Sequence, residues 1–151
     1  AYALVRFGTR SSGSVDSVHM GGVFSMINIE TGEFDRGWIR QTERLKEHSH
    51  HPDTGVLIKG TIPHWQLIKD KLLEISRFIP QMRYMGFDIA IVEDGFKIIE
   101  INSLPSIESI QCFQPIFLDP VMGEFFSKRI AEKKASLSPW KRRALDLLFG
   151  I

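Results

Sequence analysis

Three side chains near the middle of the chain, those of Asp88, Glu100 and Asn102, carry oxygen atoms within an otherwise apolar region. Carboxylate and amide oxygens are the ligands that hard cations such as Mg2+ prefer. Two carboxylates on an apolar surface repel each other and resist desolvation, and a bound cation would stabilise them. The alternative is an ordinary hairpin in which Asp88 and Glu100 lie at solvated strand ends.

The elements that must position these ligands are two strands joined by a tight turn. Residues 86–102 contain two β-branched apolar runs separated by Glu-Asp-Gly, which predicts a β-hairpin. If residues 93–95 form a three-residue loop with the glycine in a left-handed conformation, Asp88 faces Glu100. Because side chains alternate between faces, the third ligand then lies on the same side. A two-residue turn would instead put Asp88 opposite Ile101 and separate the ligands.

Both faces of this hairpin are mostly apolar, so the sequence predicts a layer on each side. The face expected to lie against a helix consists of Phe87, Ile89, Ile91, Ile99 and Ile101. The face expected beside the ligands consists of Ala90, Val92, Phe96 and Ile98.

The spacing of the three ligands, followed by the small-residue and proline segment 103–106, resembles the metal-binding hairpin of the ATP-grasp superfamily. In D-alanine–D-alanine ligases this motif ends similarly. A more specific resemblance, over roughly residues 1–115, is to the sugar-transfer-associated ATP-grasp proteins, which are also described as related to α-L-glutamate ligases. Its segments are VRFGT (5–9), VD (15–16), GGV (21–23), IETG (29–32), HP (51–52), GTIPHW (60–65) and GFDIAI (86–91).

The resemblance implies an α+β fold, the C-terminal subdomain of ATP-grasp, with a mainly antiparallel sheet covered by helices. We expect this subdomain over residues 1–115 and a helical extension over residues 116–151, packing on or beside it. The upstream half of the fold, which would supply the adenine pocket, a hinge and a phosphate-contacting lysine, is expected in a longer protein of which this chain is a piece. We therefore expect the isolated fragment to be inactive.

The implied cofactors are ATP and two Mg2+ ions, with Mn2+ as a possible replacement. By the resemblance, Glu100 would bridge the ions, Asp88 would bind one and Asn102 the other, and Ile98 would contact the nucleotide. The implied reaction joins a carboxylate to an amine through an acyl-phosphate. The substrate would be a small molecule, sugar or peptide in cell-envelope, polysaccharide or peptide-tailoring metabolism.

The chain departs from its D-alanine–D-alanine ligase relatives two residues before the aspartate, where they carry an arginine and this chain has Gly86. Arg6 and Arg10 are the candidates to replace that arginine beside the transferring phosphoryl group. The alternative is that they form surface salt bridges. Candidate substrate contacts are Ser14, Asp16, His19 and Ser106, although the first three could equally belong to a plain surface loop.

Composition agrees with a globular enzyme fragment. The 151 residues are 43% hydrophobic and 25% charged, with a net charge of +1, which argues against nucleic acid as the main partner. The single cysteine, Cys112, suits a reducing compartment. No apolar run reaches membrane-spanning length, so we expect a cytoplasmic protein without a transmembrane segment; the sequence leaves the oligomeric state open.

Periodicity and turn signals place the remaining elements. Segment 43–54, which holds His48, His50 and His51, is expected to be a solvated polar loop rather than a transition-metal site. The basic segment 128–143 is expected to be a solvated helix face, with an anionic membrane or polymer surface as the alternative. We expect strands over 2–7, 23–29 and 33–42, and helices over 62–79 (capped by Thr61), 119–135 and 138–150.

Two further functions stay open. The same fold supports phosphoryl transfer to a hydroxyl acceptor, which would leave a stable phosphorylated product. A non-catalytic nucleotide-binding module is the third possibility, slightly favoured by the missing arginine and opposed by the intact ligand set.

Overall fold

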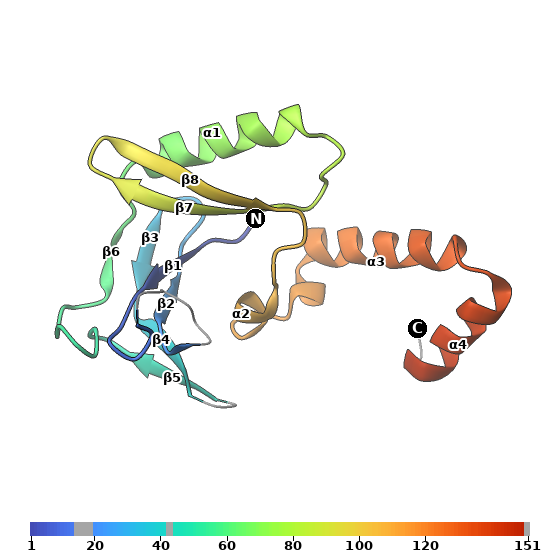
Figure 1. The fold of residues 1–151 in the computed structure, drawn as a ribbon, viewed down its shortest axis with the longest axis horizontal. Coiled ribbons are helices and arrows are strands. Elements are labelled where there is room, and N and C mark those ends of the chain that lie inside the picture. The colour runs from blue at the N-terminus through green and yellow to red at the C-terminus, as the bar shows by residue number, and fades with distance from the viewer. Residues whose placement is uncertain (14–19, 42–43, 150–151) are drawn as a thin grey trace. The chain divides into compact units, whose positions relative to one another are not determined.

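The computed structural model describes residues 1–13, 20–41 and 44–149. The fold is α+β, with antiparallel sheets and several helices, as predicted (Figure 1). The chain forms two compact units, residues 1–106 and residues 107–151. The expected domain boundary after residue 115, and the packing of the extension, stay predictions.

Unit 1 begins with two small antiparallel sheets. The four-stranded sheet has the order β1 (Leu4–Phe7), β2 (Val23–Met26), β4 (Gly37–Gln41) and β5 (Arg44–His48), and a second sheet pairs β3 (Glu33–Asp35) with β6 (Lys59–Thr61). Two predictions are wrong here. The strand expected over 33–42 is two strands in different sheets, and the expected polar loop 43–54 contains β5.

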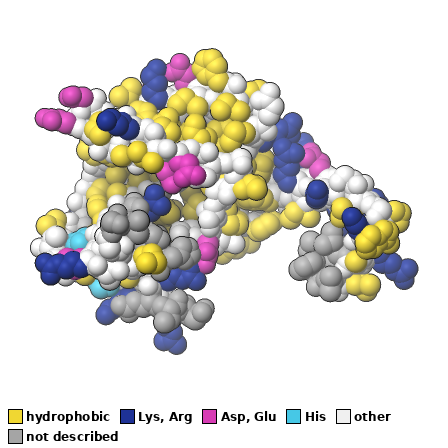
Figure 2. Space-filling model, in the orientation of Figure 1, with side chains coloured by type: hydrophobic (Ala, Val, Ile, Leu, Met, Phe, Trp, Pro, Cys, Tyr) yellow, Lys and Arg dark blue, Asp and Glu magenta, His cyan; other side chains and the backbone are white. Residues whose placement is uncertain are grey.

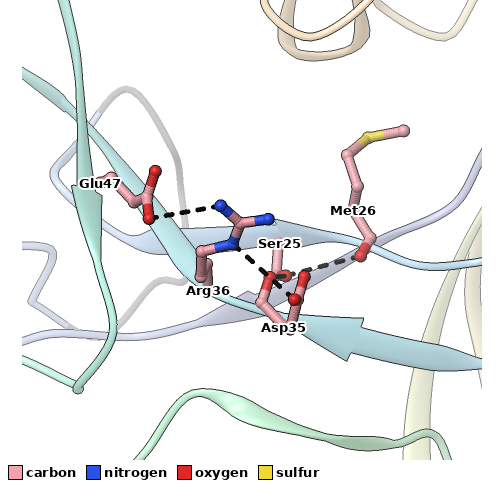
Figure 3. Close-up of polar contacts among 5 residues, drawn as sticks. All are labelled: Ser25, Met26, Asp35, Arg36 and Glu47. Atoms are coloured by element: carbon pink, nitrogen blue, oxygen red, sulfur yellow. Dashed lines mark hydrogen bonds and ion pairs between the residues drawn. The ribbon is translucent and has the colours of Figure 1, made fainter.

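Arg36 causes the break between β3 and β4. Its backbone is in the left-handed region, with φ 58°, and its N–H donates to Ile58 O at 2.8 Å. Its guanidinium lies 3.7 Å from the carboxylate of Asp35 and 3.6 Å from that of Glu47 (Figure 3). The buried Ser25 hydroxyl donates to Asp35 O at 3.2 Å. The corner between β3 and β4 is therefore held by contacts from β2, through Ser25, and from β5, through Glu47. The chain therefore changes sheets at one residue.

The central helix of unit 1, α1 (Trp65–Phe78), begins later than predicted. Thr61 was expected to cap it, but the N-cap is His64, with φ 57° and no side-chain cap. The reason is that Ile62 is still part of the extended chain: its N–H donates to Gly32 O at 2.9 Å and its side chain is buried.

Helix α1 covers one face of the hairpin formed by β7 (Gly86–Val92) and β8 (Gly95–Asn102), as predicted. Their common core lies around three buried residues, Ile27, Ile62 and Ile68. The half-buried side chains that pack against it are Ala3, Val5, Phe34, Trp65, Leu72, Ile89 and Phe96. This core joins β1, α1 and the hairpin in one unit.

Unit 2 is helical. It contains α2 (Glu108–Gln111), the short 3-10 helix η2 (Ile116–Leu118), α3 (Pro120–Ala135) and α4 (Pro139–Phe149). Helix α3 begins as predicted, because the Asp119 carboxylate accepts the N–H of Met122 at 2.9 Å. Within the described residues, no helix is long and apolar enough to cross a membrane.

Candidate functional site

The hairpin brings the predicted oxygen ligands together. Asp88 pairs directly with Glu100, and Gly86 pairs with Asn102, so the three ligand side chains belong to one face of β7 and β8. Glu100 is exposed, and Asp88 and Asn102 are half-buried. Carboxylate and amide oxygens therefore lie together where solvent and a ligand can reach them.

The predicted pairing holds, but the predicted turn is wrong. Val92 pairs with Gly95, which leaves a two-residue turn, Glu93-Asp94, and puts Gly95 at φ 145°, a conformation that favours glycine. The extra residue expected in the loop occurs further along as a β-bulge: Ile89 pairs with Ile98, Asp88 pairs with Glu100, and Ile99 has no partner. The bulge restores the register that the shorter turn would have lost.

Because of the bulge, part of β8 directs its side chains to the face opposite the predicted one. Ile98 pairs with Ile89 and Phe96 pairs with Ile91, so both face the side that packs on α1 and not the ligand side. Ile99, expected on the helix side, is 68% exposed. The predicted position of Ile98 beside the ligands is therefore wrong, and the register gives a nucleotide contact by this residue no support.

Arg6 is the predicted arginine that reaches the ligands. One of its terminal guanidinium nitrogens lies 3.6 Å from a carboxylate oxygen of Asp88, and the two side chains are 37% and 43% exposed. Strand β1 positions it: the neighbouring Val5 packs into the core, and alternation directs Arg6 to the opposite side. A guanidinium group thus lies beside the first carboxylate.

Gly86 stands where the resemblance to D-alanine–D-alanine ligases would place an arginine, and it has no room for a side chain. A Cβ atom there would lie 2.6 Å from Cβ of Pro105. Pro105 is held by Tyr84, whose hydroxyl donates to the Pro105 carbonyl oxygen at 3.4 Å, and burial raises the pKa of the Tyr84 phenol. The segment after the ligands therefore folds back over the start of β7. The contact between Pro105 and Gly86 was not predicted from the sequence, although the proline in segment 103–106 could have indicated it.

His64 connects the start of α1 to the hairpin turn, which the sequence analysis also missed. A ring nitrogen of His64 lies 3.1 Å from the Glu93 carbonyl oxygen. The next residue, Trp65, donates its indole N–H to Ile29 O at 2.9 Å. The GTIPHW segment therefore fastens two turns to the beginning of one helix.

The loop after β1 is tightly hydrogen-bonded. Thr9 and Ser12 are buried; the Thr9 N–H donates to the Ser12 hydroxyl at 2.8 Å, and the Ser12 hydroxyl donates to Thr9 O at 3.0 Å. Arg10 donates its backbone N–H to the Asp53 carboxylate at 2.8 Å, and its side chain is exposed. A catalytic role for Arg10 stays a prediction.

The predicted substrate contacts divide in two. Ser14, Asp16 and His19 lie outside the described residues. Ser106 is exposed at the end of unit 1, and a substrate contact there stays a prediction.

Two of the three histidines of segment 43–54 make hydrogen bonds through their rings. His51 Nε2 lies 3.0 Å from Gly8 O, and His50 Nδ1 lies 2.9 Å from the Ser49 hydroxyl. The buried Nε2 of His48 makes no hydrogen bond with the described residues. Among all the residues that the structure describes, no three His, Cys, Asp or Glu side chains gather into a metal-binding group. The hairpin site combines two carboxylates with an amide.

An antiparallel hairpin with this ligand set, covered by a helix, is the arrangement that the resemblance to ATP-grasp proteins implies. The chain belongs to the sugar-transfer associated ATP-grasp family, which its residues 1–118 match. No curated protein and no solved structure matches it. Membership supports nucleotide binding and an ATP-dependent, ligase-like activity.

Proposed function

We propose that the protein is an ATP- and Mg2+-dependent ligase that joins a carboxylate to an amine through an acyl-phosphate. The observation that carries this proposal is the pairing of Asp88 with Glu100, with Asn102 on the same face and Arg6 beside them. Family membership supplies the reaction class.

The donor set fits Mg2+. Asp88 and Glu100 face each other across the hairpin, and Asn102 adds an amide oxygen, all on a face that is at least partly exposed. In the proposed site Glu100 would contribute to holding both ions, Asp88 would hold one and Asn102 the other. When bound, the ions would screen the charge of the triphosphate and of the transferring phosphoryl group.

The proposed reaction has two steps. A carboxylate oxygen of the substrate attacks the γ-phosphorus of ATP, the bond to the β–γ bridging oxygen breaks, and ADP leaves. The amine then attacks the acyl carbon, the phosphate leaves, and the amine nitrogen gives up a proton. Arg6 would donate hydrogen bonds to the phosphoryl oxygens during the first step, in place of the arginine for which Gly86 and Pro105 leave no room.

The proposed setting is cell-envelope, polysaccharide or peptide-tailoring metabolism, with a small-molecule, sugar or peptide substrate. Its support is the family, whose description associates it with sugar transfer. The adenine pocket would come from the upstream half of the ATP-grasp fold.

The test is calorimetric titration of ADP, with and without Mg2+, into the intact protein and into its Asp88→Asn/Glu100→Gln variant. The matched control is Glu93→Gln/Asp94→Asn, which also removes one glutamate and one aspartate charge, but from the exposed turn of the same hairpin. Mg2+-dependent binding should be present in the wild-type and control proteins and lost in the ligand variant.

Equal binding by both variants would contradict the metal site. Absence of binding in all three proteins would favour a non-catalytic scaffold module that binds no nucleotide, in which the Arg6–Asp88 pair is structural. Once binding is established, the products decide the reaction: free phosphate and an amide support the ligase, whereas a stable phosphorylated hydroxyl product would show a phosphoryl transferase.

A further inference from the structure

Helix α4 exposes an apolar stripe that its own unit does not cover. Trp140 is 70% exposed and Leu147 is 80% exposed. They are seven residues apart, about two helical turns, so they lie on the same face, with the half-buried Ala144 between them. Large apolar side chains exposed together on one helix face indicate a binding surface.

Cations border this stripe on both sides. Lys141 and Arg143 are exposed, and the ammonium of Lys141 lies 5.4 Å from the Trp140 ring centroid. Figure 2 shows hydrophobic and Lys or Arg side chains next to each other on the C-terminal helices. Between residues 128 and 143 the chain carries seven basic residues and one acidic residue, which gives this segment a net charge of +6. Its partner should therefore be negatively charged.

Arg142 of α4 is hydrogen-bonded back to the end of α3. Its guanidinium donates to the carbonyl oxygen of Ala135, the last residue of α3, at 3.1 Å, and to Leu137 O in the connection between the helices at 3.3 Å. The Arg142 side chain is thus engaged with the end of α3, while Lys141 and Arg143 flank the stripe. We call the stripe and its flanking cations the α4 surface.

We propose that the α4 surface binds an anionic lipid membrane from the side, without spanning it. A tryptophan and a leucine flanked by lysine and arginine are suited to the boundary between headgroups and acyl chains, where apolar side chains enter and cations contact lipid phosphates. A soluble anionic polymer would use the cations but would leave Trp140 and Leu147 in water. The two kinds of side chain together therefore favour lipid.

The experiment is co-sedimentation of the intact protein with vesicles of phosphatidylcholine alone or containing about 30% phosphatidylglycerol. Binding should require the anionic lipid. Trp140→Ala/Leu147→Ala should weaken it about tenfold or more. Lys141→Gln/Arg143→Gln should weaken it about 25-fold, about fivefold for each charge.

The matched controls lie in unit 1. Leu73→Ala/Phe78→Ala removes two exposed apolar side chains from α1, and Lys46→Gln/Lys59→Gln removes two exposed cations. Both controls should bind like the wild type, and circular dichroism should show the same helix content in all variants. Failure to bind anionic vesicles would overturn the proposal. So would binding that survives the loss of Trp140 and Leu147, which would indicate an anionic polymer or a different surface.

Discussion

Replacing Arg6 by glutamine separates a structural role of this residue from a chemical one. The Arg6 guanidinium lies 3.6 Å from the Asp88 carboxylate, and both side chains are more than a third exposed. An ion pair of that exposure contributes about 0.2–1 kcal/mol to stability. We therefore expect Arg6→Gln to lower the free energy of unfolding by less than about 1 kcal/mol, measured by urea denaturation.

The expected effect on chemistry is much larger. Removing one preorganised donor that stabilises developing charge costs about 100- to 1000-fold. The assay needs no carboxylate or amine substrate: it compares the Kd of Mg2+–ADP with the Kd of Mg2+–ADP plus aluminium fluoride, which mimics the transferring phosphoryl group. Arg6→Gln should change the Kd of Mg2+–ADP by less than about threefold, and should weaken the fluoride complex about 100-fold or more.

Arg36→Gln is the matched control. Arg36 also makes ion pairs, at 3.6 and 3.7 Å, and its side chain is 57% exposed, but its partners are Glu47 and Asp35. It should show a similar small loss of stability and no loss of fluoride-complex affinity. If the two variants behave alike in both assays, Arg6 is a surface salt-bridge partner and makes no stabilising contact with the phosphoryl group.

Three other substitutions test the structure around the site. Gly95→Val should destabilise the protein by about 1–3 kcal/mol and weaken Mg2+–nucleotide binding. The reason is backbone strain at φ 145° and not a clash, because the space around Gly95 is open. Normal affinity in a folded variant would count against the observed turn. Gly37→Ala should lower the free energy of unfolding by about 1–3 kcal/mol, measured by thermal or urea unfolding. The added Cβ would overlap Val23 and lie 2.7 Å from Ile58 Cδ1. An unchanged melting temperature would show that these core side chains move to make room. Burial raises the pKa of Tyr84, so the unfolded phenol loses its proton first and stability should fall as the pH rises above about 10. Tyr84→Phe should lose less stability between pH 8 and pH 11 than the wild type, and an equal loss would assign the effect to other groups.

The sequence was most informative where local chemistry and global fold agree. Helix α3 begins at Pro120, directly after Asp119, because an aspartate cap and a first-turn proline act within a few residues. The pairing of Asp88 with Glu100 was predicted from a three-residue turn, whereas the structure reaches the same pairing through a two-residue turn and a bulge, because both faces of the hairpin are apolar and leave its register open.

Long-range contacts account for what the sequence could not predict. Strand β5 is largely charged, and it exists because β4 supplies its hydrogen-bond partners. The corner at Arg36 depends on Ile58 and Ser25, which are distant in the chain. The contact between Arg6 and Asp88 joins residues 82 positions apart, so the sequence could offer Arg6 only as a candidate.

The bulge at Ile99 divides the hairpin into two parts with different surroundings. On the turn side of the bulge, Ile89 and Phe96 belong to the core, and Lys97 pairs with Ala90 and stays exposed. On the other side, pairing positions Asp88 against Glu100. Had the extra residue stayed in the turn, Lys97 would have faced the core. The bulge therefore lets one hairpin keep Lys97 out of the core and still place Asp88 opposite Glu100.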